Sequence, residues 1–197
     1  MAATRITAGT WRGRLIDTPA GLETRPTTSL VRQALFNILG DVAGTSLVDL
    51  YAGAGTVGFE ALSRGAARVV FVERNRSTLR LVARTAERLG CADRCRLVAA
   101  DVLPWVRGRP GELATADVAF LDAPYRDQGM AAVLDALGAQ SPPVVVCEHH
   151  RAAGPPDAVG GLERVREAVY GTTRLSFYRR AGAEHEAGDA RDQRERG

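Results

Sequence analysis

The sequence predicts an α/β protein built on a Rossmann-like, doubly wound sheet whose strands are mostly parallel. From residue 46 onward, short apolar segments alternate with segments whose apolar residues recur at helical spacing, which is the pattern of a parallel sheet covered by helices. A glycine-rich loop directly follows the first of these apolar segments. The chain has 197 residues and is 45% hydrophobic, which is enough for one sizeable core and makes one main domain the expectation.

The first 43 residues are expected to form a small extension made of a hairpin and a helix. Residues Arg5–Asp17 alternate loosely between apolar and polar side chains around Gly9 and Gly13, as short hairpins do. Thr27–Ser29 offer hydroxyls that can cap a helix, and apolar residues recur at helical spacing after them. Gly40 is placed to end that helix.

The main domain is expected to span residues 44–180 and to contain a seven-stranded sheet. Tyr170–Thr172 is expected to be the turn of a C-terminal antiparallel hairpin, because the segments on both sides are typical of strands and no helix separates them. Residues 181–197 are polar, small and charged, so we expect a disordered tail. The strands are expected at 47–50, 69–72, 96–99, 117–121, 144–147, 163–169 and 173–178, and helices at 57–63, 77–89 and 129–137.

The charge of the chain is unevenly distributed. All 26 basic residues are arginine, and guanidinium groups bind phosphate bidentately, although a GC-rich codon bias explains the absence of lysine better. The tail from residue 181 carries three arginines and five acids, so it holds −2 of the net +3 and leaves +5 on the rest. This balance suits an anionic partner, although a solvated surface of mixed charge gives similar sums.

Apolar segments and cysteines restrict the setting in which the protein works. No stretch of about 18 consecutive apolar residues occurs, and the first residues lack the apolar core of a signal peptide. We therefore expect a cytoplasmic monomer without a membrane partner. The three cysteines, Cys91, Cys95 and Cys147, are expected to be reduced. We expect no metal site, because no second cysteine pair exists and His149 and His150 are adjacent rather than on one helical face.

The glycine loop after the first main-domain strand is the first candidate ligand site. Gly53, Gly55 and Gly58 let backbone amides and a helix N-terminus approach a ligand closely. Asp49 lies before the first glycine, where its carboxylate would repel a pyrophosphate but can hold a cation such as the amino group of S-adenosylmethionine. The loop therefore favours this cofactor over a nicotinamide, and the alternative is a turn whose glycines serve geometry alone.

Two further acids follow the next two expected strands. Glu73 ends the second strand, where a carboxylate can accept hydrogen bonds from both hydroxyls of a ribose. The alternative is a solvated acid paired with Arg74 or Arg76. Asp101 follows the third strand and can receive an adenine amino group, or cap the helical segment 102–107, and both roles are compatible.

The tetrapeptide Asp122–Tyr125 comes directly after an apolar strand, at the edge where open α/β sheets bind ligands. A base amino group has its lone pair delocalised into the ring, so methylation requires two acceptors that hold the nitrogen towards sp3 geometry. Asp122 can accept one N–H and the Ala123 carbonyl the other. Pro124 keeps Ala123 extended, and Tyr125 offers a face for a base taken out of its helix. We expect these four residues to be catalytic; the alternative is a strand exit with ordinary turn residues.

Together these residues resemble the bacterial RsmD-type 16S rRNA (guanine-N2)-methyltransferases, within the Rossmann-like class I S-adenosylmethionine-dependent methyltransferases. The resemblance spans about residues 4–180 and is carried by the segments 5–14, 24–39, 49–55 and 60–66. The Arg-Pro-Thr-Thr sequence at 25–28 is the most discriminating, because many methyltransferases share the glycine loop and few share this segment. The resemblance implies methylation of a guanine N2 amino group, with 16S rRNA or the assembling small ribosomal subunit as partner.

The hairpin and the cofactor loop supply most of the residues expected to bind RNA and cofactor. Trp11 of the hairpin can either stack on RNA or pack within the hairpin. The expected cofactor-binding residues are Asp49, Tyr51, Ala52, Gly53, Gly55, Gly58, Glu73, Asp101 and Val102. The expected RNA-binding residues are Arg5, Arg12, Arg14, Arg25, Thr27, Thr28 and Arg32.

One residue departs from the family pattern, since Ala123 stands where the family motif has a proline. Alanine keeps the acceptor carbonyl but not the fixed φ of proline, so the loop is expected to be looser. Other functions stay open. A DNA adenine-N6 methyltransferase would use nearly the same tetrapeptide, although the chain has no room for a separate target-recognition segment. A non-catalytic RNA-binding assembly factor would share the fold, whereas a nicotinamide oxidoreductase would leave Asp49 without a role.

Overall fold

A computed structural model describes residues 2–19, 28–123, 129–139 and 142–182 of the chain. Arg25, Thr27, Pro124 and Tyr125 lie outside the described residues, and so does the expected disordered tail from residue 183 onward. None of the described helices has the length and the apolar character needed to cross a membrane.

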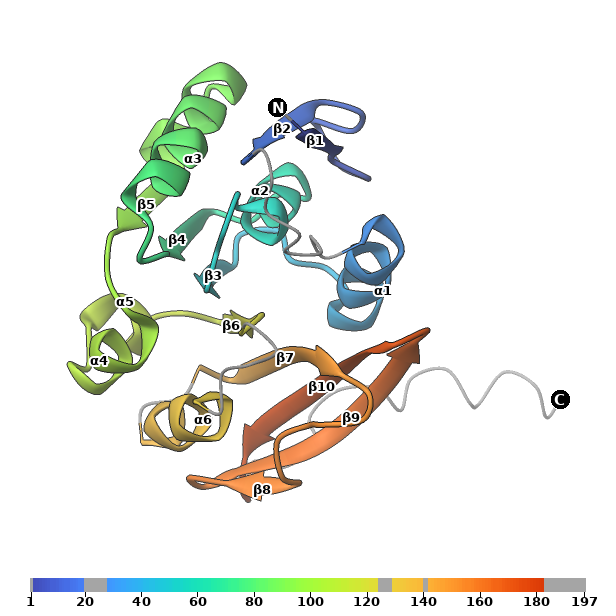
Figure 1. Ribbon diagram of the computed structural model, residues 1–197, viewed down its shortest axis with the longest axis vertical. Helices are drawn as coiled ribbons and strands as arrows, with labels where there is room; N and C mark the ends of the chain where they lie inside the picture. The colour runs from blue at the N-terminus through green and yellow to red at the C-terminus, as the bar shows by residue number, and fades with distance from the viewer. Residues whose placement is uncertain (1, 20–27, 124–128, 140–141, 183–197) are drawn as a thin grey trace, which may run out of the picture.

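A mixed sheet forms the centre of the fold, and in the described part of the chain it has eight strands in the order β5-β4-β3-β6-β7-β10-β9-β8 (Figure 1). The first five in this order are parallel, whereas β10 pairs antiparallel with β7 and β9, which confirms the predicted sheet and C-terminal hairpin. The expected number of seven strands was one too few, because β8 has two residues and cannot show a period. The strands are β3 (Ser46–Leu50), β4 (Arg68–Val72), β5 (Cys95–Val98), β6 (Val118–Leu121), β7 (Val144–His150), β8 (Ala158–Val159), β9 (Leu162–Tyr170) and β10 (Thr173–Arg180).

Helices cover both faces of this sheet (Figure 1). The first three α-helices pack on one face and the last three on the other. The helices expected at 57–63, 77–89 and 129–137 are found within one residue of those bounds. The helical elements are α1 (Ser29–Leu39), α2 (Thr56–Ser63), α3 (Arg76–Leu89), the 3-10 turn η1 (Ala92–Arg94), α4 (Val102–Arg107), α5 (Gly111–Ala114) and α6 (Met130–Gly138).

The central strands are apolar on both faces because helices cover both. Leu47 and Phe71 belong to the hydrophobic cluster under α1, α2 and α3. Their neighbours Val48 and Val72 belong to the cluster under α4, α5 and α6. Successive side chains of a strand point to opposite faces, so the continuous apolar runs seen in the sequence supply both clusters.

Helix ends are placed by the residues that the sequence offered for them. The Thr28 hydroxyl accepts a hydrogen bond from the Val31 amide at 3.3 Å, which makes it the N-cap of α1. Gly40 ends this helix with a φ of 80°. The predicted capping hydroxyl and stop are both confirmed. At α3 the cap is Asn75, whose side chain accepts hydrogen bonds from the Ser77 and Thr78 amides.

The N-terminal segment forms the expected hairpin, and its strands lie at and just beyond the two ends of the expected range 5–17. β1 (Ala2–Arg5) and β2 (Leu15–Thr18) pair antiparallel, and the residues between them form the connection. Ile6, Trp11 and Ile16 are buried in the same hydrophobic cluster as α1, α2 and α3. The hairpin is therefore packed into the core of the main domain, where β2 lies beside α3 (Figure 1).

Candidate cofactor and substrate site

The strand order reverses between β3 and β6, since β4 and β5 continue on one side of β3 and β7 continues on the far side of β6. Open α/β sheets bind ligands in the crevice outside the carboxyl ends of the strands at such a reversal. The Asp122 amide donates a hydrogen bond to the Leu50 carbonyl at 3.5 Å, so the chain leaving β6 stays beside the end of β3. Asp49 and Asp122 therefore lie at the same edge of the sheet, where the carboxyl ends of the parallel strands meet.

Asp49 is a buried carboxylate on β3, with 2% of its surface exposed. One Oδ accepts a hydrogen bond from the Gly58 amide at 3.1 Å. Burial raises the pKa of Asp49 to about 8, the Gly58 amide opposes this, and the negative charge of Glu73 raises the pKa further. Among the described residues, no ion pair includes Asp49. A cation that binds here would stabilise the ionised carboxylate.

Glu73 follows β4 and braces the glycine loop. Its two carboxylate oxygens accept hydrogen bonds from the Gly53 amide at 3.1 Å and the Asn75 amide at 2.8 Å. The Ala52 amide donates to the Val72 carbonyl at 3.0 Å, which ties the same loop to β4. The ion pair of Glu73 with Arg74 or Arg76, the alternative left open by the sequence, is absent from the described residues. Each carboxylate oxygen keeps a lone pair for a ligand hydroxyl.

The glycines of the loop do different work. A Cβ added at Gly58 would lie 2.2 Å from Phe71 Cε1, and one at Gly55 would lie 2.9 Å from the same atom. These two glycines therefore let α2 pack closely on β4, so the geometric interpretation applies to them. A Cβ at Gly53 would meet only the Tyr51 carbonyl oxygen, at 4.0 Å, which leaves its outer side open to a ligand. Tyr51 itself has a left-handed φ of 62°.

The start of α4 follows β5, the neighbour of β4 in the sheet, with Asp101 as the N-cap and Val102 as the first helical residue. Asp101 is exposed and occupies the N-cap position, but its side chain makes no capping hydrogen bond. The predicted capping role is thus met by position only. Val102 is 4% exposed and belongs to the core under α4, so its main chain, rather than its side chain, is the part that a cofactor can reach.

Asp122 and Ala123 are the two members of the tetrapeptide within the described residues. Asp122 is partly buried directly after β6, and Ala123 is 4% exposed. Their placement at the strand reversal matches the predicted position of the catalytic segment. The roles expected for Pro124 and Tyr125 lie outside the described residues.

Arg32 corrects one expectation about RNA contacts. Its guanidinium is fully buried, donates to the Arg5 carbonyl at 2.7 Å, and has Nε 3.8 Å from a Glu60 carboxylate oxygen. Burial lowers the pKa of Arg32, while the charges of Glu60 and Glu148 raise it. The prediction that Arg32 contacts RNA phosphate is wrong, because the helical spacing places this side chain towards the core.

Three of the other predicted RNA-binding residues lie on the hairpin. Arg5, Arg12 and Arg14 are exposed. Trp11 is 9% exposed, and the Arg94 guanidinium lies 5.2 Å from the centre of its ring. Of the two alternatives for Trp11, the structure supports packing and not stacking on RNA. Thr28 uses its hydroxyl as the α1 cap.

Glu60, for which the sequence patterns predict no role, joins the hairpin to the main domain. Glu60 is fully buried on α2, and it accepts hydrogen bonds from the Thr7 amide, the Thr7 hydroxyl and the Ala8 amide at 2.7–3.0 Å. Arg64 Nε lies 3.0 Å from the same carboxylate. Every residue of α2 is buried, so an acid within this apolar helix was the available signal.

A ligand for this edge must satisfy two demands at once. The buried Asp49 suits a cation, and Glu73 at the end of the neighbouring strand suits ribose hydroxyls. S-adenosylmethionine has both an ammonium group and a ribose, so these two acceptors fit it. With the antiparallel C-terminal hairpin, fold and site define a class I S-adenosylmethionine-dependent methyltransferase.

Comparison with known proteins gives the family. The chain belongs to the family described as "Conserved hypothetical protein 95", whose model matches residues 4–179. It is 31% identical to the "Putative rRNA methyltransferase YlbH" of Bacillus subtilis over 183 residues, which cover 90% of this chain and 100% of that protein. It is 34% identical to the Escherichia coli "Ribosomal RNA small subunit methyltransferase D" over 125 residues, or 62% of this chain and 60% of that protein.

Solved structures share this fold. The "Putative methyltransferase yhhF from Escherichia coli" superposes with a TM-score of 0.79 at 26% identity, covering 91% of this chain and 98% of that one. The RNA methyltransferase of Salinibacter ruber, solved in complex with S-adenosyl-L-homocysteine, shares the fold with a TM-score of 0.62 at 20% identity, over 82% and 97% of the two chains. The cofactor of the family is S-adenosylmethionine.

Proposed function

We propose that this protein transfers a methyl group from S-adenosylmethionine to the N2 amino group of a guanine in 16S rRNA. The observation that carries the proposal is the position of Asp122 and Ala123, directly after β6 at the strand reversal and beside the end of β3. The names of the relatives support ribosomal RNA as the substrate class, and the assembling small subunit in the cytoplasm is the expected setting.

The chain offers a separate group for each part of the cofactor. Asp49 would hold the ammonium group, Glu73 the ribose hydroxyls, and Asp101 the adenine amino group. The loop at Tyr51–Gly55 would supply main-chain contacts, because Glu73 holds it through the Gly53 amide and the outer side of Gly53 is open. Bound S-adenosylmethionine supplies an electrophilic methyl group.

The substrate nitrogen is prepared by acceptors on the chain. One Asp122 Oδ accepts one N–H of the guanine amino group, and the Ala123 carbonyl accepts the other. Held in this way, the nitrogen would direct its lone pair out of the ring plane towards the methyl group. The bond to nitrogen would form as the bond from that methyl group to sulfur breaks, and the sulfur would keep the electron pair as S-adenosylhomocysteine leaves. The amino proton then passes to Asp122 Oδ or to water. Positioning is the main catalytic contribution, and Tyr125 is proposed to stack on the base.

The N-terminal extension, residues 1–43, is proposed to bind the RNA backbone. Arg5, Arg12 and Arg14 are exposed on the hairpin, and guanidinium groups pair readily with phosphate. Glu60 fixes the hairpin to α2, so these arginines are held in a constant relation to the methyltransferase domain at residues 44–180. Arg25 and Thr27 remain part of the proposed RNA surface.

Methyl transfer with radiolabelled cofactor tests the proposal. The acceptors are small ribosomal subunits, naked 16S rRNA and DNA from a strain that lacks the enzyme, with wild type, Asp122→Ala and the control Asp93→Ala. Asp93 is exposed within η1, before β5 begins, away from the site at the carboxyl ends of the strands. We expect label on ribosomal RNA, recovered as N2-methylguanosine, and a loss of about 100-fold or more in Asp122→Ala alone.

Three outcomes contradict the proposal. Label on DNA alone indicates the adenine-N6 activity. RNA binding without any methyl transfer by wild type indicates an assembly factor that is not an enzyme. Equal label with wild type and Asp122→Ala removes Asp122 from the chemistry.

A further inference from the structure

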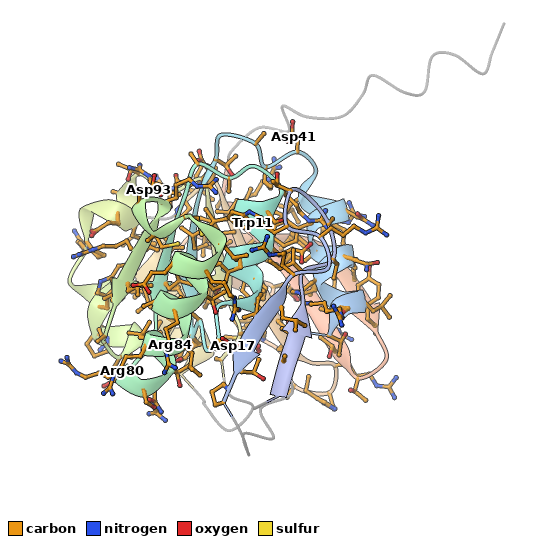
Figure 2. All side chains as sticks on the ribbon, turned by 90° about the horizontal axis from the view of Figure 1, so that it is seen from above. Trp11, Asp17, Asp41, Arg80, Arg84 and Asp93 are labelled. Atoms are coloured by element: carbon orange, nitrogen blue, oxygen red, sulfur yellow. The ribbon has the colours of Figure 1, made fainter. Side chains whose placement is uncertain are left out.

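Four arginines follow one another along α3 at intervals of four residues: Arg76, Arg80, Arg84 and Arg88, here called the arginine stripe. Residues four apart lie on neighbouring turns of the same helix face. All four are exposed, whereas the opposite face of α3 buries Leu79, Val82, Ala86 and Leu89 in the core. Figure 2 shows Arg80 and Arg84 on the outer side of the helix.

The stripe is not a consequence of the arginine-rich composition alone. α3 contains four arginines in 14 residues. The other five α-helices of the described part of the chain together contain two, Arg32 and Arg107. If composition alone set the count, arginines would be spread over the exposed faces of several helices.

The stripe lacks nearby compensation along most of its length. Among the described residues, Arg88 pairs with Asp17 at 2.8 Å, while no ion pair includes Arg76, Arg80 or Arg84. Like charges four residues apart destabilise a helix. A helix that keeps three such steps, with Glu87 as its only acid, suits a binding partner of opposite charge.

The stripe joins two parts of the molecule that the proposed function already uses. Its first residue, Arg76, lies three positions after Glu73, at the cofactor edge of the sheet. At its other end, Arg88 donates to the Leu15 carbonyl at 2.6 Å, and Arg14 of the hairpin donates to the Arg88 carbonyl at 3.4 Å. Figure 2 shows the hairpin that carries Asp17 alongside α3. The stripe therefore extends from the hairpin to the cofactor edge of the sheet.

The length of the stripe matches a nucleic-acid backbone. Twelve residues of helix rise about 18 Å, and about ten phosphates lie along that length of a duplex. An anionic membrane is the weaker candidate, because a membrane-surface helix turns an apolar face outward and the apolar face of α3 is buried in the core.

We propose that the arginine stripe of α3 is a second RNA-backbone binding surface, which together with the hairpin fixes the RNA on the enzyme while the target guanine is at the site. The proposal rests on the proposed function of that site. The stripe recognises phosphate and not base sequence. It therefore contributes affinity and orientation, and the choice of nucleotide lies elsewhere.

The test compares the salt dependence of RNA binding for wild type, Arg80→Gln/Arg84→Gln and the control Arg107→Gln/Arg180→Gln, all as full chains with a full-length 16S rRNA transcript as probe. Glutamine keeps helix propensity, and the control pair is exposed at the ends of α4 and β10, away from α3. We expect the slope of log affinity against log salt to fall by about two for the stripe variant. Between about 50 and 200 mM salt, this variant then loses about tenfold less affinity than wild type.

Two further measurements make the outcome unambiguous. Cofactor affinity and the melting temperature are expected to match wild type in both variants, which separates lost contacts from misfolding.

An unchanged slope in the stripe variant overturns this proposal, and the proposed function stands if wild type still methylates the RNA. Binding to phosphatidylserine vesicles that is lost in the stripe variant, with an unchanged RNA slope, overturns it in favour of a membrane. Absence of both RNA binding and methylation by wild type overturns both proposals.

Discussion

Asp49 and Glu60 are two buried carboxylates of one strand-loop-helix unit, and their surroundings differ. Glu60 is fully buried among the Thr7 amide and hydroxyl, the Ala8 amide and the Arg64 guanidinium. Asp49 is 2% exposed, accepts one hydrogen bond from Gly58, and lies near the negative charge of Glu73. One carboxylate is satisfied by the protein, and the other is left for a ligand.

This difference follows from the cost of burying charge. A buried ion is tolerated when partners replace the water that it has lost. Glu60 has such partners, so it acts as a structural link between the hairpin and α2. Asp49 lacks them, and its pKa rises to about 8 in consequence. A cationic cofactor supplies the missing partner, which makes binding and ionisation of Asp49 one linked event.

The largest expected effect is on stability, from removal of the satisfied carboxylate. Glu60→Ala leaves the Arg64 and Arg32 guanidinium groups without their buried partner, and we expect a loss of about 3–5 kcal/mol in the free energy of unfolding. Urea denaturation measures it. The control Glu87→Ala removes an exposed acid of α3 and should stay within about 0.5 kcal/mol of wild type. A Glu60→Ala loss as small as that of the control would remove the structural role of Glu60.

The next effect sharpens the contrast, because removal of the unsatisfied carboxylate should spare the fold. Asp49→Asn keeps an acceptor for the Gly58 amide but cannot pair with an ammonium ion, so we expect cofactor binding to weaken by about 2–5 kcal/mol. Calorimetric titration with S-adenosylmethionine measures this loss. Cofactor affinity equal to that of wild type would contradict the assignment.

The same variant predicts a pH dependence of stability. The folded-state pKa of Asp49, about 8, lies above the ordinary value of 3.8, so the protonated form is favoured by folding. The stability gained from protonated Asp49 is fully present below pH 3.8 and is lost as the pH rises towards 8. Without cofactor, wild type should therefore lose stability relative to Asp49→Asn across this range, as measured by denaturation at several pH values. Parallel curves would contradict the raised pKa.

The sequence was sufficient to predict the main strands and helices of the main domain and the edge of the sheet where the site lies. Strand and helix periods are local properties of the sequence. Asp49, Glu73 and Asp122 lie at or just after the ends of their strands, and parallel strands place these ends at the same edge of the sheet. What could not be predicted depends on contacts between distant segments. Arg32 and Glu60 meet beside Thr7, and no local pattern states that an arginine and an acid from different helices share one buried network.

The smallest expected effect concerns the loop after β6. Ala123→Pro restores the fixed φ of the family motif and should stabilise the protein by about 0.4–1 kcal/mol, with a modest gain in the rate of methyl transfer. Ala123→Gly is the matched control and should change both quantities in the opposite direction. Single-turnover kinetics with saturating cofactor measures the rate. Slower transfer in Ala123→Pro would indicate that the site needs the flexibility of alanine.

The most direct test of the account is the number of protons released when S-adenosylmethionine binds at pH 7, obtained by calorimetry in buffers of different ionisation enthalpy. With a pKa of about 8, Asp49 is mostly protonated in the free protein at this pH. Pairing with the cofactor ammonium group ionises it, so we expect the release of nearly one proton per cofactor bound. Binding heats that are the same in every buffer would contradict it, because Asp49 would then carry its charge before the cofactor arrives.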